Sequence, residues 1–246
     1  MNHRFWLLSL DKFEVILRFK VAINRNKYIK DIAKGYANNQ AIPSDARYAH
    51  EARLKGILGN HYLKVIPYFA RNTIRSLKSG DKIFEKKALS NFDSYVTEWA
   101  STEALKKARS IADTDTDDVL RVIQTGLLEG ASIPEISKGI RKVTGLTPYR
   151  ASVVARTETH NAATLASIES VRDVEEQSNT VFLKRWIPTN DPRTRDSHAV
   201  MLGSEAIGLD EPFIVDGESL DRPGDPSGSA GNIIHCRCQI IFEEKL

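Results

Sequence analysis

The hydrophobic pattern changes near residue 180, and this change constrains the fold more than any other feature. Before it, most apolar residues follow the spacing of α-helices. After it, residues 180–187 alternate and are rich in β-forming residues, which predicts a strand. The sequence therefore predicts an α+β protein, with a mostly helical N-terminal region (1–146) and a small α+β module (147–246) of about three short antiparallel strands on a helix.

Residues that begin and end helices divide the N-terminal region. Ser132 and Glu135 form a capping box with Pro134 in the first turn. The acidic residues at 113–118 are expected to interrupt a long helix and to cap the next one in solvent, since the glycine and glutamate of a calcium loop are missing. The expected helices cover 5–23, 45–58 with its end near Gly59, 60–78 (kinked or broken at Pro67), 81–112, 117–130, 132–145 and 147–171.

The module is expected to hold short elements and one long loop. Asp191 and Pro192 have the residue types of an N-cap and a first helical position, so a short helix is expected from there to Met201. The other expected elements are strands at 213–215 and 233–242, with a loop at 220–232.

Composition excludes several classes of protein. The chain has 246 residues, 41% of them hydrophobic, which is enough for a sizeable core. The longest early apolar run, 5–10, is far shorter than the roughly 20 residues of a membrane span. Charged residues interrupt the apolar stretch, which is not typical of a signal peptide. The two cysteines lie too close in sequence for an unstrained disulfide. We therefore expect a soluble protein of a reducing compartment, with no membrane partner.

Charge is distributed unevenly along the chain. Residues 1–110 hold 21 lysines and arginines against 10 acidic residues, a net charge of +11, whereas residues 111–246 hold 14 against 22, a net charge of −8. A basic half can face a polyanion, most simply double-stranded DNA bound through its phosphates without base recognition. The alternative is a solvated helix surface.

Residues with possible chemistry gather in the C-terminal module. His198 can be a metal ligand or general base, or a member of a surface ion-pair network with Arg195 and Asp196. Cys236 and Cys238 would share one face of the last expected strand. This spacing favours buried, inert thiols, whereas a zinc site would need His198, or an acidic residue such as Asp225, to complete it.

An ordered set of motifs covers the last third of the chain. Its parts are "ARTE" at 155–158, Asn161, Trp186, "DPRTRDSH" at 191–198, Gly203, "RPGDPSGSAGN" at 222–232 and "HCRC" at 235–238. In this order they resemble the phage head-morphogenesis, or minor head protein, family named after the F protein of phage Mu. His235 departs from the pattern, since an asparagine is expected before the cysteine.

The resemblance implies a minor structural component of a tailed-phage head. It implies association with the portal protein, and further contact with major capsid or scaffold protein and packaged DNA. The expected location is the virion, inside the capsid near the portal vertex, after assembly in the host cytoplasm. The basic residues within 1–110 could then face DNA or an acidic portal surface.

We interpret the motif residues first as a structural network and not as a catalytic centre. The planar guanidinium groups of the arginines suit bidentate pairing with carboxylates such as Glu158, Asp191 or Asp225. The alternative is an enzyme, a metal-dependent hydrolase or nuclease or a toxin-like protein, that uses His198 with Asp196 or with Cys236 and Cys238. No cofactor is expected unless zinc binds, and no toxin domain is expected after Phe242. The network residues are Arg156, Glu158, Trp186, Asp191, Arg193, Arg195, His198 and Arg237.

Overall fold

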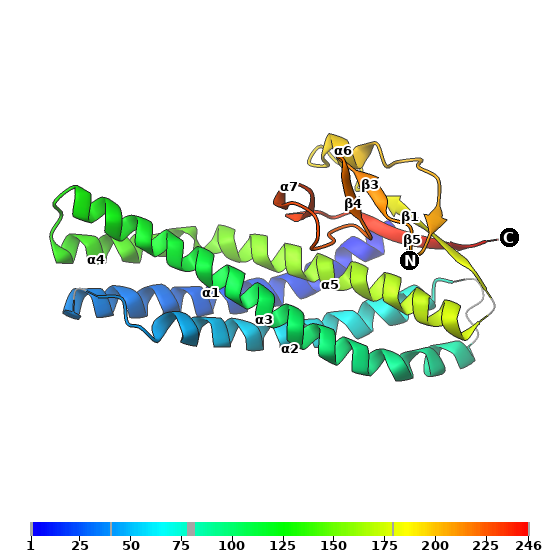
Figure 1. Ribbon diagram of the computed structural model, residues 1–246, viewed down its shortest axis with the longest axis horizontal. Coiled ribbons are helices and arrows are strands. Elements are labelled where there is room, and N and C mark those ends of the chain that lie inside the picture. The colour runs from blue at the N-terminus through cyan, green and yellow to red at the C-terminus, as the bar shows by residue number, and fades with distance from the viewer. Residues whose placement is uncertain (1, 40, 78–81, 179, 246) are drawn as a thin grey trace. The chain divides into compact units, whose positions relative to one another are not determined.

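The computed structural model describes residues 2–39, 41–77, 82–178 and 180–245 (Figure 1). Long helices occupy the chain up to residue 177, as the sequence predicts. A 3₁₀ turn, η1, links the fourth helix to the fifth. The helical elements are α1 (His3–Asn39), α2 (Ala46–Ile74), α3 (Lys82–Leu128), α4 (Ile133–Lys142), η1 (Val143–Leu146) and α5 (Thr147–Gln177).

The remaining residues form two small antiparallel sheets, so the expected α+β class is confirmed. One sheet has the order β2-β1-β5, and the other is the hairpin of β3 and β4. The hairpin turns at Asp216 and Gly217, whose φ angles of 54° and 77° fit the tight turn that favours these residue types. The elements are β1 (Phe182–Ile187), α6 (Asp196–Ala199), β2 (Ile207–Gly208), β3 (Phe213–Val215), β4 (Glu218–Leu220), α7 (Ala230–Ile233) and β5 (Gln239–Glu244).

The chain divides into two compact units. Unit 1 contains 1–14, 62–97 and 156–246, and unit 2 contains 15–61 and 98–155. The sequence boundary that we expected, between 146 and 147, lies inside unit 2 at the start of α5 and stays a prediction. The core of unit 1 packs Ile168 of α5 against both sheets, and the core of unit 2 surrounds Tyr28 and Ile140.

Two breaks that the sequence predicts in the helices are absent from the described residues. α2 runs through both Gly59 and Pro67 as one helix. Proline removes one backbone N–H, and the residue that loses this partner, Leu63, is exposed, so water can satisfy its carbonyl. The expected ends at 78 and 81 lie outside the described residues.

The acidic residues at 113–118 lie in the middle of α3 and not at a solvated cap. Asp115 is 2% exposed and accepts hydrogen bonds from Arg25 Nε (2.7 Å) and His50 Nε2 (2.9 Å). Asp118 accepts from another nitrogen of Arg25 at 2.8 Å. These tertiary ion pairs hold the stretch in a helix, although the intrinsic helix propensity of aspartate is low.

The prediction for α4 is confirmed at its start. The Glu135 carboxylate accepts from the Ser132 backbone N–H at 2.8 Å, as in a capping box. At its other end α4 stops at Lys142, and η1 takes the place of its expected last turn.

The last strand is shorter than predicted. β5 begins at Gln239, because α7 occupies 230–233 and His235 adopts a left-handed conformation with φ of 61°. The two cysteines therefore lie in a turn before the strand and not on it. No helix in the described ranges is both long and apolar enough to cross a membrane.

Candidate functional site

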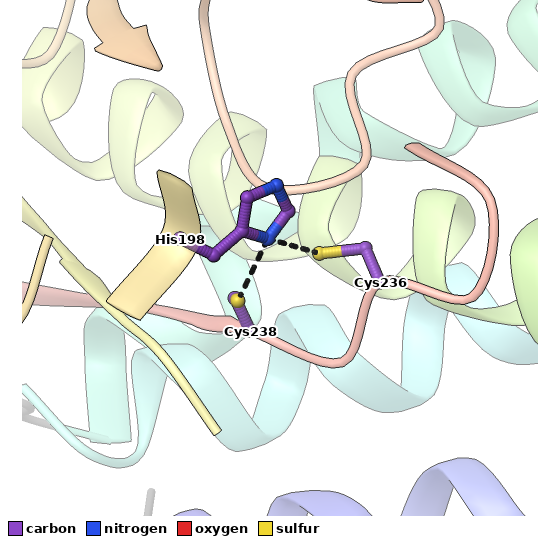
Figure 2. A group of neighbouring side chains, drawn as sticks. All are labelled: His198, Cys236 and Cys238. Carbon is purple, nitrogen blue, oxygen red and sulfur yellow. Dashed lines mark hydrogen bonds between the residues drawn. The ribbon is translucent and has the colours of Figure 1, made fainter. Parts of the chain in front are cut away.

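Three donor side chains from two distant segments meet inside unit 1 (Figure 2). His198 lies on the single turn of α6, which Arg195 precedes as N-cap. Cys236 and Cys238 lie between α7 and β5, and both side chains point toward the imidazole. Their ligand atoms all lie within 4.8 Å of one another.

The contacts within this group are short. Nδ1 of His198 lies 3.4 Å from Sγ of Cys238 and 3.7 Å from Sγ of Cys236. None of the three side chains is more than 2% exposed. Hydrogen bonding with Cys236 and with His198 lowers the pKa of Cys238 to about 4, whereas burial raises the pKa of Cys236. The group can therefore hold a thiolate in the core.

An apolar shell and one amide enclose the three residues. Trp186 of β1 meets the His198 ring edge-on, with centroids 5.3 Å apart. Phe213, Val215, Leu220 and Ile240 complete the surrounding cluster. On the other side of the imidazole, Nε2 lies 3.4 Å from Oδ1 of Asn232. This contact replaces the network with Arg195 and Asp196 that we expected for His198.

Asp191 is the centre of a second polar group. Its carboxylate accepts the Arg193 backbone N–H at 2.8 Å and pairs with the side chains of Arg193 and Arg237. Although its partial burial opposes the change, these hydrogen bonds lower the pKa of Asp191 to about 2. Asp191 is thus part of a turn, and the expected helix begins only at Asp196.

The other motif residues have different partners. Arg156 pairs with Glu14 at 3.3 Å, while the Tyr62 hydroxyl donates to Glu158 at 2.7 Å. Arg195 donates to the backbone carbonyl of Ile234. Asp225 lies 3.7 Å from Arg222 and accepts backbone N–H groups of its own loop.

Four arginines and one histidine line a pocket of about 310 Å³ on the surface of unit 1: Arg156, Arg193, Arg195, His235 and Arg237. Among the residues that the structure describes, the carboxylates that pair with these arginines are those of Glu14 and Asp191. The pocket therefore carries excess positive charge, and these neighbouring arginines, after burial, lower the pKa of His235.

Sequence reasoning missed three residues that support the cysteines. Asn232 faces His198, His160 Nε2 lies 2.7 Å from the Cys238 carbonyl oxygen, and the Thr189 hydroxyl donates to the Arg237 carbonyl at 2.7 Å. Asn232 belongs to the "RPGDPSGSAGN" motif, which was a signal for it. Thr189 and His160 had none, because their roles depend on tertiary contacts.

Comparison with known proteins agrees with this module. Residues 117–241 match the family described as Phage Mu protein F like protein. The minor head protein GP7 of Bacillus phage SPP1 is 25% identical over 51% of this chain and 40% of its own length. The NAD(+)–arginine ADP-ribosyltransferase EFV of Enterococcus faecalis is 30% identical over 55% of this chain and 27% of its own length. No solved structure matches.

The match covers half of the chain and includes every motif residue of the C-terminal module described above. The chain is therefore a phage head-type protein by family: it belongs to the Phage Mu protein F like proteins. It spans less than half the length of either relative, so activities of those whole proteins are not transferred with the family.

Proposed function

We propose that this chain is a minor head protein of a tailed bacteriophage, which enters the procapsid through contact with the portal protein. Family membership over residues 117–241 is the observation that carries the proposal. The relative from phage SPP1, named a minor head protein, supports the same role. In this role the chain ends up inside the virion near the portal vertex, after assembly in the host cytoplasm.

An exposed apolar face on α1 supports a docking role. The side chains of Ile16, Phe19 and Ile23 follow one another at helical spacing and are 56%, 67% and 54% exposed. Phe5 and Leu8, earlier on the same helix, are also exposed. Exposed large apolar side chains in a row are typical of protein interfaces. We propose that the portal protein covers them.

Basic side chains next to this face favour an acidic partner surface. Lys20, Lys27 and Arg53 line a groove of about 460 Å³ in unit 2, together with Ile23 and Ile57. A portal helix with acidic and apolar side chains would match this groove. DNA phosphates would match the cations and leave the apolar side chains uncovered, so we propose DNA as the weaker, sequence-independent partner.

We propose an assembly role without catalysis. The cysteines and His198 are buried, which keeps them from a macromolecular substrate. The ring nitrogens of His198 contact Asn232 and the two cysteines, and not Asp196, the partner that a hydrolase would use. The transferase activity in the name of the Enterococcus faecalis relative belongs to a protein of which this chain spans 27%.

Co-expression with the portal protein of the same phage tests the proposal. The two proteins should co-purify through an affinity tag on the portal and remain together at 0.5 M salt, about where screening suppresses exposed ion pairs. Co-purification of this chain with the major capsid or scaffold protein, but not with the portal, would assign it another place in the head.

A further inference from the structure

We propose that His198, Cys236 and Cys238 bind one zinc ion, which fixes the segment before β5 to α6. The inference goes beyond the assembly role and does not depend on it. Cysteine thiolates and imidazole are the usual zinc ligands, and the combination of two cysteines with one histidine is known among zinc sites. Three protein ligands leave one position of a tetrahedron, which a water molecule would fill.

The distances agree with tetrahedral coordination. With Zn–S of about 2.3 Å and Zn–N of about 2.0 Å, a tetrahedron places nitrogen about 3.5 Å from each sulfur. Nδ1 of His198 lies 3.4 Å from one Sγ and 3.7 Å from the other. An ion can therefore bind between the three atoms with small side-chain movements only.

Asn232 holds the imidazole in the form that ligation requires. Its Nδ2 donates to the Val215 carbonyl at 3.4 Å, which turns Oδ1 toward Nε2 of His198. Because Oδ1 only accepts, the proton belongs on Nε2 and the lone pair of Nδ1 faces the sulfurs. A hydrogen bond of this kind on the outer nitrogen accompanies almost every zinc-bound histidine.

The backbone holds both cysteines in place from outside. The left-handed conformation of His235 directs its own side chain to the arginine pocket, while Cys236 and Cys238, which follow it in the chain, turn inward. The carbonyl oxygens of Arg237 and Cys238 are bound by Thr189 and His160. Turns of this kind, in which surrounding contacts hold a residue in an unfavourable backbone conformation, are concentrated at functional sites.

Charge also favours a divalent ion. Two thiolates and a neutral imidazole carry a total charge of −2, which Zn²⁺ cancels. A neutral group is the form that the apolar cluster around Trp186 and Phe213 can enclose at least cost. Binding would release the protons that remain on the two cysteines.

Cobalt substitution of the unmodified full-length chain is the first test. Co²⁺ added to the reduced, metal-free protein should give a thiolate-to-cobalt charge-transfer band and the visible bands of a tetrahedral ion. Because Cys236 and Cys238 are the only cysteines, any such band comes from them. Zn²⁺ should displace the cobalt at one ion per chain.

A matched pair of variants assigns the third ligand. His198→Asn should lose stoichiometric zinc, whereas His235→Asn should keep it, since His235 lies beside the cysteines but faces away and asparagine tolerates the left-handed conformation. Asn232→Ala should weaken binding about 10- to 100-fold. A chelator should lower the melting temperature of the wild type and of His235→Asn, and leave that of His198→Asn unchanged.

Three results would overturn the proposal. One is a folded, reduced wild-type protein that binds neither cobalt nor zinc. Another is equal zinc content in the two histidine variants. The third is a disulfide between the cysteines in protein purified with alkylation of free thiols. If His198→Asn does not fold, the cobalt spectrum of the wild type still decides.

Discussion

The Nδ1 atom of His198 lies 3.4 Å from the Sγ atom of Cys238, although 40 residues separate them in the chain. This contact joins α6 to the turn before β5. Both sheets contribute side chains around it, Trp186 and Ile240 from one and Phe213 and Leu220 from the other. The centre of the module is thus a small polar group inside an apolar shell, and the surface arginines lie outside it.

Gly224 approaches His160 so closely that a side chain should not fit. A Cβ at Gly224, where φ is 75°, would lie 2.5 Å from His160 Nδ1. We expect Gly224→Ala to lower the free energy of unfolding by about 2–4 kcal/mol, from backbone strain and the clash together. Gly203→Ala is the matched control, with φ of 82° and nothing within 4 Å, and should cost only about 1 kcal/mol. Equal losses in denaturant titrations would contradict this account.

Arg25 is the centre of the polar core of unit 2. Its side chain is 1% exposed and binds Asp115, Asp118, the Val143 carbonyl and the Thr147 hydroxyl. Arg25→Met leaves Asp115 buried without this partner. The free energy of unfolding, measured by chemical denaturation, should therefore fall by about 3–5 kcal/mol.

Arg47 is the control for Arg25, because it also pairs with two carboxylates, Asp113 and Glu51, but is 28% exposed. Arg47→Met should lower the free energy of unfolding by about 1 kcal/mol or less. Similar losses for the two variants would mean that burial of the Arg25 ion pairs does not decide their contribution.

Asp191 should make stability depend on pH in acid. Its pKa is about 2 in the folded protein against 3.8 as the ordinary value, so its contribution is complete above about pH 4 and is lost as pH falls toward 2. Because the carboxylate is partly exposed, we expect this contribution to be only about 1 kcal/mol.

Carbon NMR of the carboxyl groups measures this directly, with a midpoint near 2 expected for Asp191. Asp191→Asn should remove the corresponding acid dependence of the free energy of unfolding. A midpoint near 3.8 would show that Arg193 and Arg237 do not bind the carboxylate in solution.

The exposed apolar face of α1 should be needed for incorporation. Phe19→Glu places a charge in this face and should reduce the amount of the chain in procapsids at least tenfold, without changing the melting temperature. Leu128→Glu is the control, since Leu128 is 89% exposed at the end of α3. Quantitative mass spectrometry of procapsids compares them, and equal incorporation would remove the face from the interface.

Point variants are needed here, because removal of residues 1–23 would damage unit 1. Trp6 is fully buried and meets the Phe69 ring at 4.7 Å, and Glu14 pairs with Arg156. A truncated chain would therefore test folding and docking at once.

Binding to DNA should be electrostatic and independent of sequence. Exposed cations on α1 include Lys12, Arg18, Lys20, Lys27, Lys30 and Lys34. If the full-length chain contacts DNA through them, duplexes of unrelated sequence should bind equally, and each phosphate contact should add about −0.9 to the log–log salt slope. Fluorescence anisotropy measures this slope, and a slope near zero would exclude phosphate contacts.

Local signals in the sequence predict the class of fold well and its longest-range features poorly. The capping box at Ser132 depends on neighbouring residues and occurs as expected, and the turn at Asp216 likewise depends on residues next to each other in the chain. The continuity of α3 depends instead on Arg25, which lies 90 residues from Asp115. No pattern within 113–118 carries that information.

The site shows the same division. Its three donor residues could be selected from the sequence by their chemistry alone. Their convergence could not, because it depends on a tertiary contact between α6 and the segment before β5, which lie about 40 residues apart in the chain. Asn232, which fixes the imidazole, appeared only as one letter of a loop motif.

The most direct measurement locates the chain in a purified procapsid. A gold label attached to the protein and imaged by electron cryomicroscopy should appear inside the shell at a single vertex, the one that holds the portal. Labels distributed over all vertices, or shells that contain none of this protein, would contradict its assignment as a portal-associated minor head protein.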